Sequence, residues 1–350
     1  MPASNIQPEA DQFSPLTEKQ INARPAIRFW LFSICALIFA MVVVGGATRL
    51  TGSGLSITEW KPIVGAIPPL SDADWQDAFS KYKTIPQYHE INKGMSLTEF
   101  KSIFWWEWAH RFLGRFIGVA FLLPFLFFLF TKRIEPSMSP KFWLMFLGGG
   151  LQGFVGWYMV ASGLTERVDV SQYRLAAHLG LAILLYGYIF WVAINLGSEK
   201  TTQQRSGNKL FISAVGLTAL IYLQIIAGAF VAGLKAGKSH NTWPLMDGRW
   251  IPNGLDAMNP FWRNLFENVL TVQFNHRAIA YLLVLAVVLH LVKAIITKNQ
   301  TAIVGAGFIL IALLCQISIG IMTLLKFVPL DLALLHQAAA VILFSISIWH

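Results

Sequence analysis

Eight apolar runs of about 20 residues constrain this 350-residue chain more than any other feature of its sequence. A run of this length crosses the hydrocarbon core of a bilayer as a helix, because a helix satisfies its backbone hydrogen bonds internally. We therefore predict an all-α, polytopic membrane protein with eight transmembrane helices. The predicted helices cover residues 28–50, 107–130, 141–161, 174–196, 209–234, 272–296, 301–325 and 329–349.

Composition agrees with a membrane protein and suggests its orientation. Hydrophobic residues make up 55% of the chain and charged residues only 13%, so lipid is the expected surrounding of most of it. The net charge of +9 does not indicate a nucleic-acid partner, because Lys and Arg gather in short connections, where they set topology. These residues are Lys132, Arg133, Lys200, Arg205 and Lys298. The positive-inside rule therefore predicts that both termini are cytoplasmic and that the two long connections face outward.

The cysteines and the N-terminal residues bear on the cellular compartment. Only two cysteines occur, Cys35 and Cys315, and both lie inside apolar runs, so neither a disulfide framework nor a thiolate metal site is expected. The N-terminal residues carry Glu9, Asp11 and Glu18 without an apolar core, which fits neither a secretory signal nor an acid-poor transit peptide. We expect a multi-pass protein of the bacterial inner (cytoplasmic) membrane.

The two halves of the chain look like copies of one four-helix unit, because small and polar residues recur in the same order. The recurring residues are Gly46-Ala47 and Gly228-Ala229, His110-Arg111 and His276-Arg277, Gln152 and Gln316, and His178 and His336. We predict two pseudo-symmetric four-helix bundles related by an axis along the membrane normal. The expected boundaries are a cytoplasmic tail at 1–27, a first bundle at 28–196, a cytoplasmic linker at 197–208 and a second bundle at 209–350.

Four histidines combine a transmembrane position with a counterpart in the other half. They are His110, His178, His276 and His336, each near the outward end of an even-numbered helix. A single histidine in a span is more often a buried side chain that bridges helices, but recurrence as pairs favours ligation. Two imidazoles from neighbouring helices form an axial ligand set for haem iron, whereas a closed zinc site needs four ligands. His290 is about 21 Å along the helix from His276 and is not expected to share its site.

The halves differ at one charged position. Glu107 precedes His110 by three residues, whereas Gln273 stands at the matching place before His276. A carboxylate beside a haem can accept protons or stabilise developing positive charge, and an amide can do neither. The alternative is that Glu107 faces lipid headgroups. The difference between Glu107 and Gln273 within a duplicated pair favours instead a chemical role for the first half. The arginines Arg111, Arg115 and Arg277 could pair with haem propionates or extend to lipid phosphates.

Several segments of the first half together resemble the haem A synthase family. These segments are 45–56 (GGATRLTGSGLS), 60–62 (WKP), 68–69 (PP), 100–101 (FK) and 107–111 (EWAHR). The similarity covers essentially the whole chain from about residue 28, and is to the branch found in proteobacteria and mitochondria. Another branch carries a cysteine pair in the first outward connection, and this sequence has no cysteine there. Any redox step that depends on that pair is therefore absent.

The resemblance implies an enzyme that oxidises the C8 methyl group of haem O to the formyl group of haem A, with water as the source of oxygen. It implies that His276 and His336 are axial ligands of a permanently bound haem b. It also implies that His110 and His178 hold the substrate haem and that Glu107 is catalytic. A haem O synthase, the farnesyltransferase that makes the substrate, is an expected partner. Whether the chain forms a homo-oligomer is left open by the sequence.

Two other functions compete with this interpretation. A di-haem membrane electron carrier linked to a quinol would keep both haems permanently and would tolerate replacement of Glu107 by glutamine. A transporter with histidines in a proton path would use the repeat, but histidines at one depth do not trace a path across the bilayer.

Overall fold

The computed structural model describes residues 16–61, 64–161, 163–166, 168–196 and 209–350. Residues 1–15 of the predicted N-terminal tail and all of the predicted linker 197–208, with Lys200 and Arg205, lie outside the described residues. Within the described ranges, helices are the only regular secondary-structure elements, apart from one isolated β-bridge between Met246 and Arg249. The predicted all-α class is therefore confirmed.

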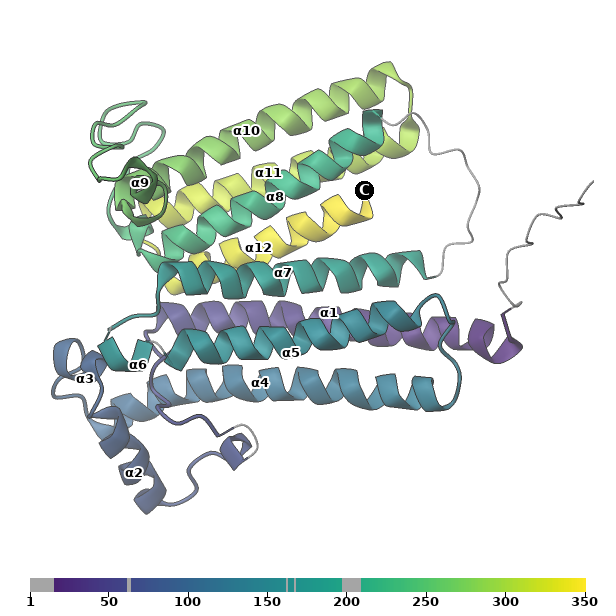
Figure 1. Cartoon of the computed structure of the whole chain (residues 1–350). Coiled ribbons are helices and arrows are strands. Elements are labelled where there is room, and N and C mark those ends of the chain that lie inside the picture. Colours follow the sequence, from purple (N-terminus) through teal and green to yellow (C-terminus); the bar gives the residue numbers. More distant parts are fainter. Residues whose placement is uncertain (1–15, 62–63, 162, 167, 197–208) are drawn as a thin grey trace, which may run out of the picture.

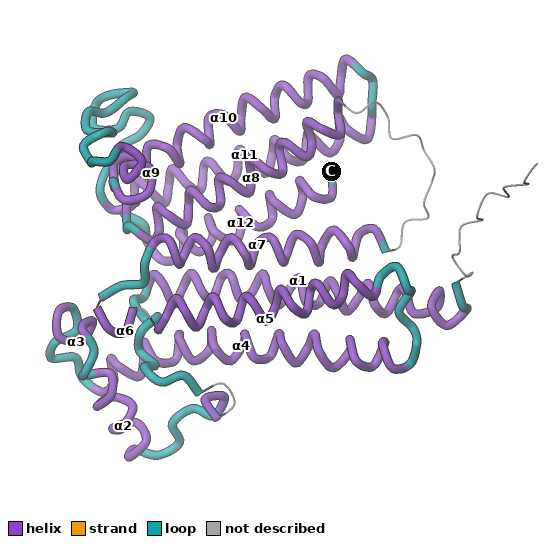
Figure 2. The backbone as a smooth tube through the Cα atoms, in the orientation of Figure 1, coloured by secondary structure: helices purple, strands orange, loops and turns teal. Residues whose placement is uncertain are grey.

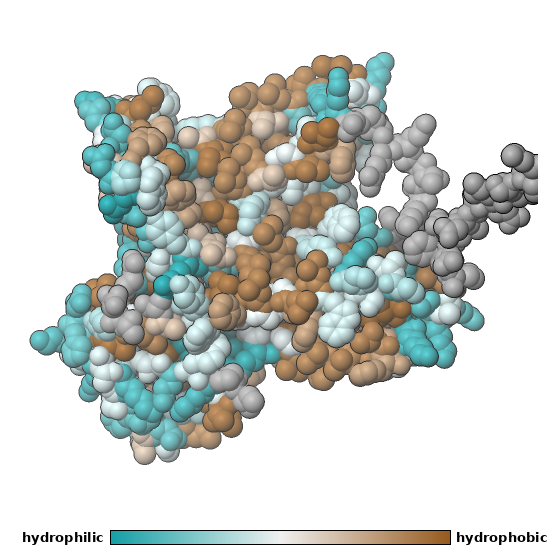
Figure 3. Space-filling model, in the orientation of Figure 1, coloured by the Kyte–Doolittle hydropathy of each residue, from teal (hydrophilic) through white to brown (hydrophobic). Residues whose placement is uncertain are grey.

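Eight of the described helices are long and apolar enough to cross a membrane, which confirms the predicted number. They are α1 (Glu18–Leu50), α4 (Leu97–Phe130), α5 (Ser139–Ala161), α7 (Gln172–Asn195), α8 (Lys209–Gly233), α10 (Val269–Ile296), α11 (Gln300–Leu325) and α12 (Leu330–Trp349). Figure 3 shows hydrophobic residues along the visible sides of these helices and hydrophilic residues towards their ends. This distribution suits helices whose outer sides face lipid.

Short helices lie in the connections between the long ones. They are η1 (Val64–Ala66), α2 (Asp72–Tyr82), α3 (Pro86–Glu90), α6 (Gly163–Glu166), η2 (Ala236–Lys238), η3 (Phe261–Arg263) and α9 (Asn264–Glu267). Figure 1 shows that the two long connections gather at one end of the molecule, while the start of α1 and the end of α12 point to the other. This arrangement agrees with an even number of crossings.

Helix α4 begins ten residues before the predicted span, at Leu97 instead of Glu107. Its first turn is fixed by a capping box, in which Ser96 Oγ accepts from Glu99 N and Glu99 Oε2 accepts from Ser96 N. Hydropathy alone does not detect this polar first turn. His110 therefore lies more than three turns inside the helix instead of one.

The long helices form two groups of four that lie side by side (Figure 2). One group contains α1, α4, α5 and α7, the other contains α8, α10, α11 and α12, and the interface joins α7 to α8 and α1 to α12. This grouping is consistent with the inferred duplication. The groups differ in detail, because α10 packs closely along α11 whereas α4 makes only limited contact with α5.

Aromatic packing holds both the first group and the long connection after α1. The Trp30 ring of α1 lies 5.0 Å from Phe121, and its Nε1 donates to the carbonyl oxygen of Ala120. In the connection, the Phe79 ring of α2 stacks on Phe100 of α4 at 5.0 Å. The connection after α1 therefore has a small apolar core of its own, packed on the extended first turns of α4.

Candidate functional site

A cavity of about 1450 Å³ lies within and between the two helix groups. Its walls include all four predicted histidines, His110, His178, His276 and His336. Pockets for drug-sized ligands usually occupy about 300–1,000 Å³, so this cavity has room for something larger. The cavity brings together the residues that the sequence predicted.

In the second group, His276 of α10 and His336 of α12 face each other. Their ring centroids are 6.4 Å apart and the ring planes are 77° to one another. Two imidazoles whose nitrogens each lie about 2 Å from a shared first-row metal have ring centroids roughly 6 Å apart. Within the described residues, His336 Nδ1 is buried without a hydrogen-bond partner. The spacing of this pair therefore fits axial ligation of a haem iron.

In the first group, His110 of α4 and His178 of α7 line the same cavity. The rings are not in direct contact in the part of the chain that the structure describes. The two pairs of histidines are thus similar in position and different in detail.

Glycines make room for the imidazoles. A Cβ atom added at Gly156 of α5 would lie 2.8 Å from His178 Cε1, and one at Gly320 of α11 would lie 2.7 Å from His336 Cε1. Both distances are shorter than normal carbon contacts, so no larger residue fits unless the imidazole moves. The presence of glycine at both positions therefore has a steric cause.

The structural counterpart of Gly228 is Gly45, and not Gly46 as predicted. A Cβ atom at Gly45 would meet the His110 ring and one at Gly228 would meet the His276 ring, whereas one at Gly46 would meet Gln337. The sequence pairing was wrong by one residue, because two adjacent glycines gave no means of choosing between them.

Three glutamines hold the main chain of the candidate site. Each donates a hydrogen bond through Nε2 to the carbonyl oxygen of one of the predicted histidines. The bonds are Gln152 to His178 at 3.1 Å, Gln224 to His276 at 3.0 Å and Gln316 to His336 at 2.9 Å. Sequence analysis found the pair Gln152 and Gln316 but missed Gln224. The available signal was an amide inside an apolar run, where an unpaired amide is costly.

Two of these amides also lie against the imidazole rings. Gln224 Nε2 is 3.2 Å from His276 Nδ1 and 3.3 Å from His276 Nε2, and Gln152 is placed similarly on His178. An atom almost equidistant from both ring nitrogens cannot lie on the in-plane lone pair of either one. The amide therefore fixes the ring while leaving its nitrogens able to bind a metal.

Glu107 is buried and fully engaged with its surroundings. The residue is 2% exposed, and Glu107 Oε2 accepts hydrogen bonds from Ser56 Oγ at 2.8 Å and Ile57 N at 2.7 Å. Glu107 Oε1 lies 2.5 Å from Arg111 Nη2, which also donates to the Ile57 carbonyl oxygen. The carboxylate thus faces the cavity, anchors the long connection after α1 and is not on the exposed surface.

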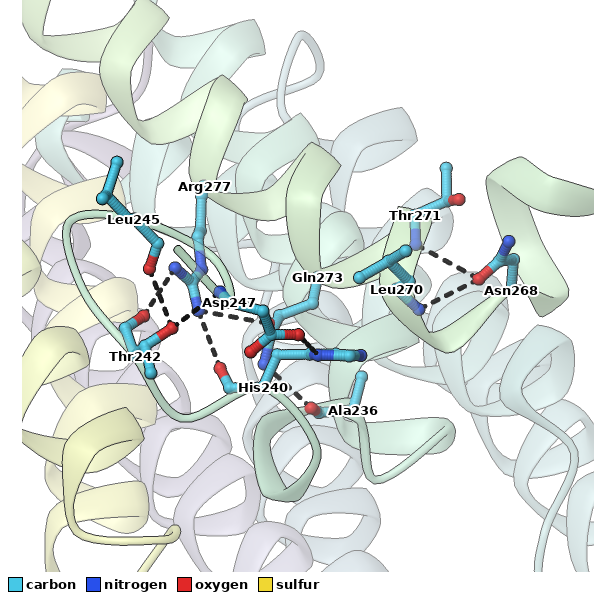
Figure 4. Close-up of polar contacts among 10 residues, drawn as sticks. All are labelled: Ala236, His240, Thr242, Leu245, Asp247, Asn268, Leu270, Thr271, Gln273 and Arg277. Atoms are coloured by element: carbon cyan, nitrogen blue, oxygen red, sulfur yellow. Dashed lines mark hydrogen bonds and ion pairs between the residues drawn. The ribbon is translucent and has the colours of Figure 1, made fainter. Parts of the chain in front are cut away.

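Gln273 and Arg277 anchor the other long connection in the same way (Figure 4). Gln273 Nε2 donates to the carbonyl oxygen of Ala236 at 2.9 Å. Arg277 donates to the carbonyl oxygens of Thr242 and His240 at 2.8 and 2.9 Å. Glu107 accepts hydrogen bonds from the connection after α1, whereas Gln273 donates a hydrogen bond to the connection after α8. The carboxylate-to-amide difference therefore follows the hydrogen-bonding groups that each connection presents.

A cluster of charged side chains joins the two helix groups beside the cavity. Asp169, before α7, lies 3.3 Å from Arg49 Nη1 of α1 and 2.5 Å from Lys235 Nζ after α8. Arg49 also donates to the Gly233 carbonyl oxygen, and both Arg49 and Lys235 line the cavity. Sequence analysis did not predict this contact, because its members come from distant parts of the chain.

The predicted arginines all line the cavity, and each is bonded to main-chain oxygens. Arg115 Nη2 donates to the Lys61 carbonyl oxygen at 2.9 Å, and Arg111 and Arg277 make the bonds described above. Their side chains therefore stabilise the two long connections and contribute positive charge to the cavity wall.

The two cysteines lie apart from each other in the long helices. Cys35 of α1 is a buried free thiol and Cys315 of α11 is an exposed one. Within the described residues, no group of three or more His, Cys, Asp or Glu side chains is placed to hold a metal ion.

His290 and His350 form a separate pair. Their Nε2 atoms are 2.7 Å apart, and His290 Nδ1 lies 2.8 Å from Ser213 Oγ. His290 is 3% exposed, so this contact is internal. His290 lies at the end of α10 remote from His276, as the sequence predicted.

Sequence comparison identifies the family of the chain. The profile of the cytochrome oxidase assembly protein family COX15-CtaA matches residues 28–348. The chain belongs to this family. The match covers all eight long helices except the first turns of α1 and the last residue of α12.

Curated relatives of this family member carry the name Heme A synthase. The protein of Parvibaculum lavamentivorans is 54% identical over 333 residues, which cover 95% of both chains. That of Bradyrhizobium diazoefficiens is 52% identical over 92% of this chain and 90% of its own. That of Nitrosospira multiformis is 49% identical over 95% of this chain and 94% of its own. The resemblance found in the sequence is thereby confirmed.

Proposed function

We propose that this chain is a haem A synthase, which oxidises the C8 methyl group of haem O to the formyl group of haem A. The observation that carries the proposal is one cavity whose walls include two histidine pairs, in a chain about half identical to proteins named Heme A synthase. The name of the relatives supports formation of haem A, and the two histidine pairs in the cavity wall support two haem sites.

The two pairs would have different roles. His276 and His336, with ring centroids 6.4 Å apart, would hold a resident haem b, which supplies one-electron acceptance when it is bound. His110 and His178 would hold haem O as substrate. The carbonyl bonds from Gln224 and Gln316 support a permanent site in the second group, because they fix both of its histidines.

Glu107 would accept protons that the oxidation releases. Conversion of a methyl to a formyl group takes one oxygen from water and releases four electrons and four protons. Glu107 lines the cavity one helical turn from His110, within reach of protons released there. Its bonds to Arg111 and Ser56 keep the carboxylate in place for this role. The electrons would leave through the second group to a one-electron acceptor in the membrane.

We further propose a bacterial inner membrane location with cytoplasmic termini. Lys132, Arg133 and Lys298 lie at the ends of long helices, in short connections away from the two long ones. On this proposal, residues 28–196 form the substrate half and residues 209–350 the resident haem half.

A haem O synthase would deliver the apolar substrate by direct contact, and failure to co-purify the two proteins in mild detergent would argue against that contact.

The experiment compares purified wild-type protein with Glu107→Gln, both from cells that also make haem O. Visible spectroscopy and haem extraction should find haem b and haem A in the wild type, with haem O accumulating in the variant. Haem b alone in both proteins, in an unchanged ratio, would exclude the synthase and favour the di-haem electron carrier.

A further inference from the structure

One of the four cavity histidines, His110, is held differently from the other three. The main-chain carbonyl oxygens of His178, His276 and His336 each accept a hydrogen bond from a glutamine side chain. Among the described hydrogen bonds, no side chain makes this contact with His110. A buried hydrogen bond of this kind contributes about 0.5–1.5 kcal/mol to holding a segment in place.

Met41 occupies the position in α1 where a glutamine would be needed. Gly45 of α1 touches His110 as Gly228 of α8 touches His276, so these glycines are structural counterparts. Gln224 precedes Gly228 by four residues, and Met41 precedes Gly45 by four. Met41 does face α4, because its methyl carbon lies 3.3 Å from a Cβ atom added at Gly114, one turn after His110. A thioether cannot donate the missing hydrogen bond.

Helix packing around His110 also differs from that around His276. The helix that carries His110, α4, packs on α1 but makes only limited contact with α5, whereas its counterpart α10 packs closely on both α8 and α11. Glu107 and Arg111, which flank His110, are hydrogen-bonded to the long connection after α1. The segment around His110 therefore lacks close packing on the side of α5.

We propose that His110 is the exchangeable axial ligand of the substrate haem and that His178 is the lasting one, an inference that rests on the proposed function. The bond between iron and His110 Nε2 forms after the substrate enters and breaks before the product leaves, while the bond to His178 persists through the reaction. A substrate haem has to come and go, whereas a resident haem does not. The structure accordingly restrains both histidines of the second pair and only one of the first.

The first test compares His110→Ala with His178→Ala in cells that make haem O. His110→Ala should keep most of its haem O and haem A and show a five-coordinate, high-spin spectrum for that haem. His178→Ala should lose this haem. In the matched second pair, His276→Ala and His336→Ala should lose haem b to similar extents. Equal loss of haem O and haem A in both first-group variants would overturn the proposal.

The second test replaces Met41 of α1 and Gln224 of α8 each by the residue at the other position, and uses carbon monoxide as the probe. In the reduced wild-type protein, carbon monoxide should bind the substrate haem and not the resident haem b. Met41→Gln should slow this binding about fivefold, the effect of one added hydrogen bond. Gln224→Met should allow carbon monoxide to bind the resident haem b as well. Unchanged rates in both variants, at normal haem content, would also overturn the proposal.

The two failures are distinguishable. Wild-type protein that carries haem b and never haem O or haem A would refute the proposed function itself. Protein that carries haem O or haem A, but whose His110 and His178 variants behave alike, would refute only the exchangeable role of His110.

Discussion

Gln316 of α11 donates a hydrogen bond through Nε2 to the carbonyl oxygen of His336 in α12, at 2.9 Å. The bond fixes the main chain of a proposed haem ligand from the neighbouring helix. It lies at the cavity wall, where loss of a donor leaves a buried carbonyl group that water cannot easily satisfy.

Replacement of this donor should loosen the resident haem. We expect Gln316→Leu to destabilise the protein by about 1–3 kcal/mol and to lower the ratio of haem b to protein after detergent washing. The matched control is Gln337→Leu, because Gln337 Nε2 donates to the Val42 carbonyl oxygen at 2.7 Å and not to a histidine. The control should lose stability and keep its haem b. Equal loss of haem b in both variants would contradict a specific role for Gln316.

A methyl group beside His336 should displace its imidazole. In Gly320→Ala the new Cβ atom would lie 2.7 Å from His336 Cε1, too close to be accommodated without movement. We expect haem b content to fall at least severalfold, with a changed spectrum for what remains. Gly307→Ala in the same helix is the control, because a Cβ atom there meets nothing within 4 Å. That variant should bind haem normally and, with its added helix propensity, be at least as stable as the wild type.

The sequence was sufficient to predict the features that depend on periodicity and repetition. Long apolar runs gave all eight membrane-spanning helices, and recurrence gave the four histidines that the cavity brings together. Both signals are local to a segment or arise from comparison of two segments. Neither requires knowledge of how the helices pack.

Features that depend on packing were not predictable in the same way. Gln224 has no recurring partner, because the equivalent residue of α1 is Met41, so the repeat gave no signal for it. The start of α4 at Leu97 was missed because its first turn is polar and is set by the Ser96 cap. The choice between Gly45 and Gly46 depends on which one faces α4, and that is a property of the helix crossing.

Asp169 should help to hold the two helix groups together. It pairs with Arg49 and Lys235, and the Arg49 side chain is only 16% exposed. Asp169→Asn would leave the mostly buried Arg49 without a counterion, so we expect a loss of about 1–3 kcal/mol, seen as a lower thermal midpoint in detergent. Glu59→Gln is the control, because Glu59 pairs with Lys61 on an exposed connection and should change stability by less than about 1 kcal/mol. An Asp169→Asn variant as stable as the control would contradict this role of Asp169.

The contact between His290 and His350 should contribute to stability without contributing to haem binding. His290 is 3% exposed, and its ring nitrogens lie 2.7 Å from His350 Nε2 and 2.8 Å from Ser213 Oγ. His290→Leu removes both contacts and leaves the half-buried Ser213 hydroxyl with only main-chain partners, so the free energy of unfolding should fall by about 1–3 kcal/mol, the sum of two lost hydrogen bonds. Haem b content should stay at the wild-type level, because His290 lies at the end of α10 remote from His276.

His276→Leu is the comparison for that variant, since it removes an imidazole from the same helix at the cavity. It should lose haem b, whereas His290→Leu should not. Thermal melting and the pyridine haemochrome spectrum, measured on the same preparations, separate the two effects. If His290→Leu loses haem b while retaining its thermal midpoint, the two histidine pairs are coupled along α10. The assignment of His276 and His336 as a self-contained pair would then be wrong.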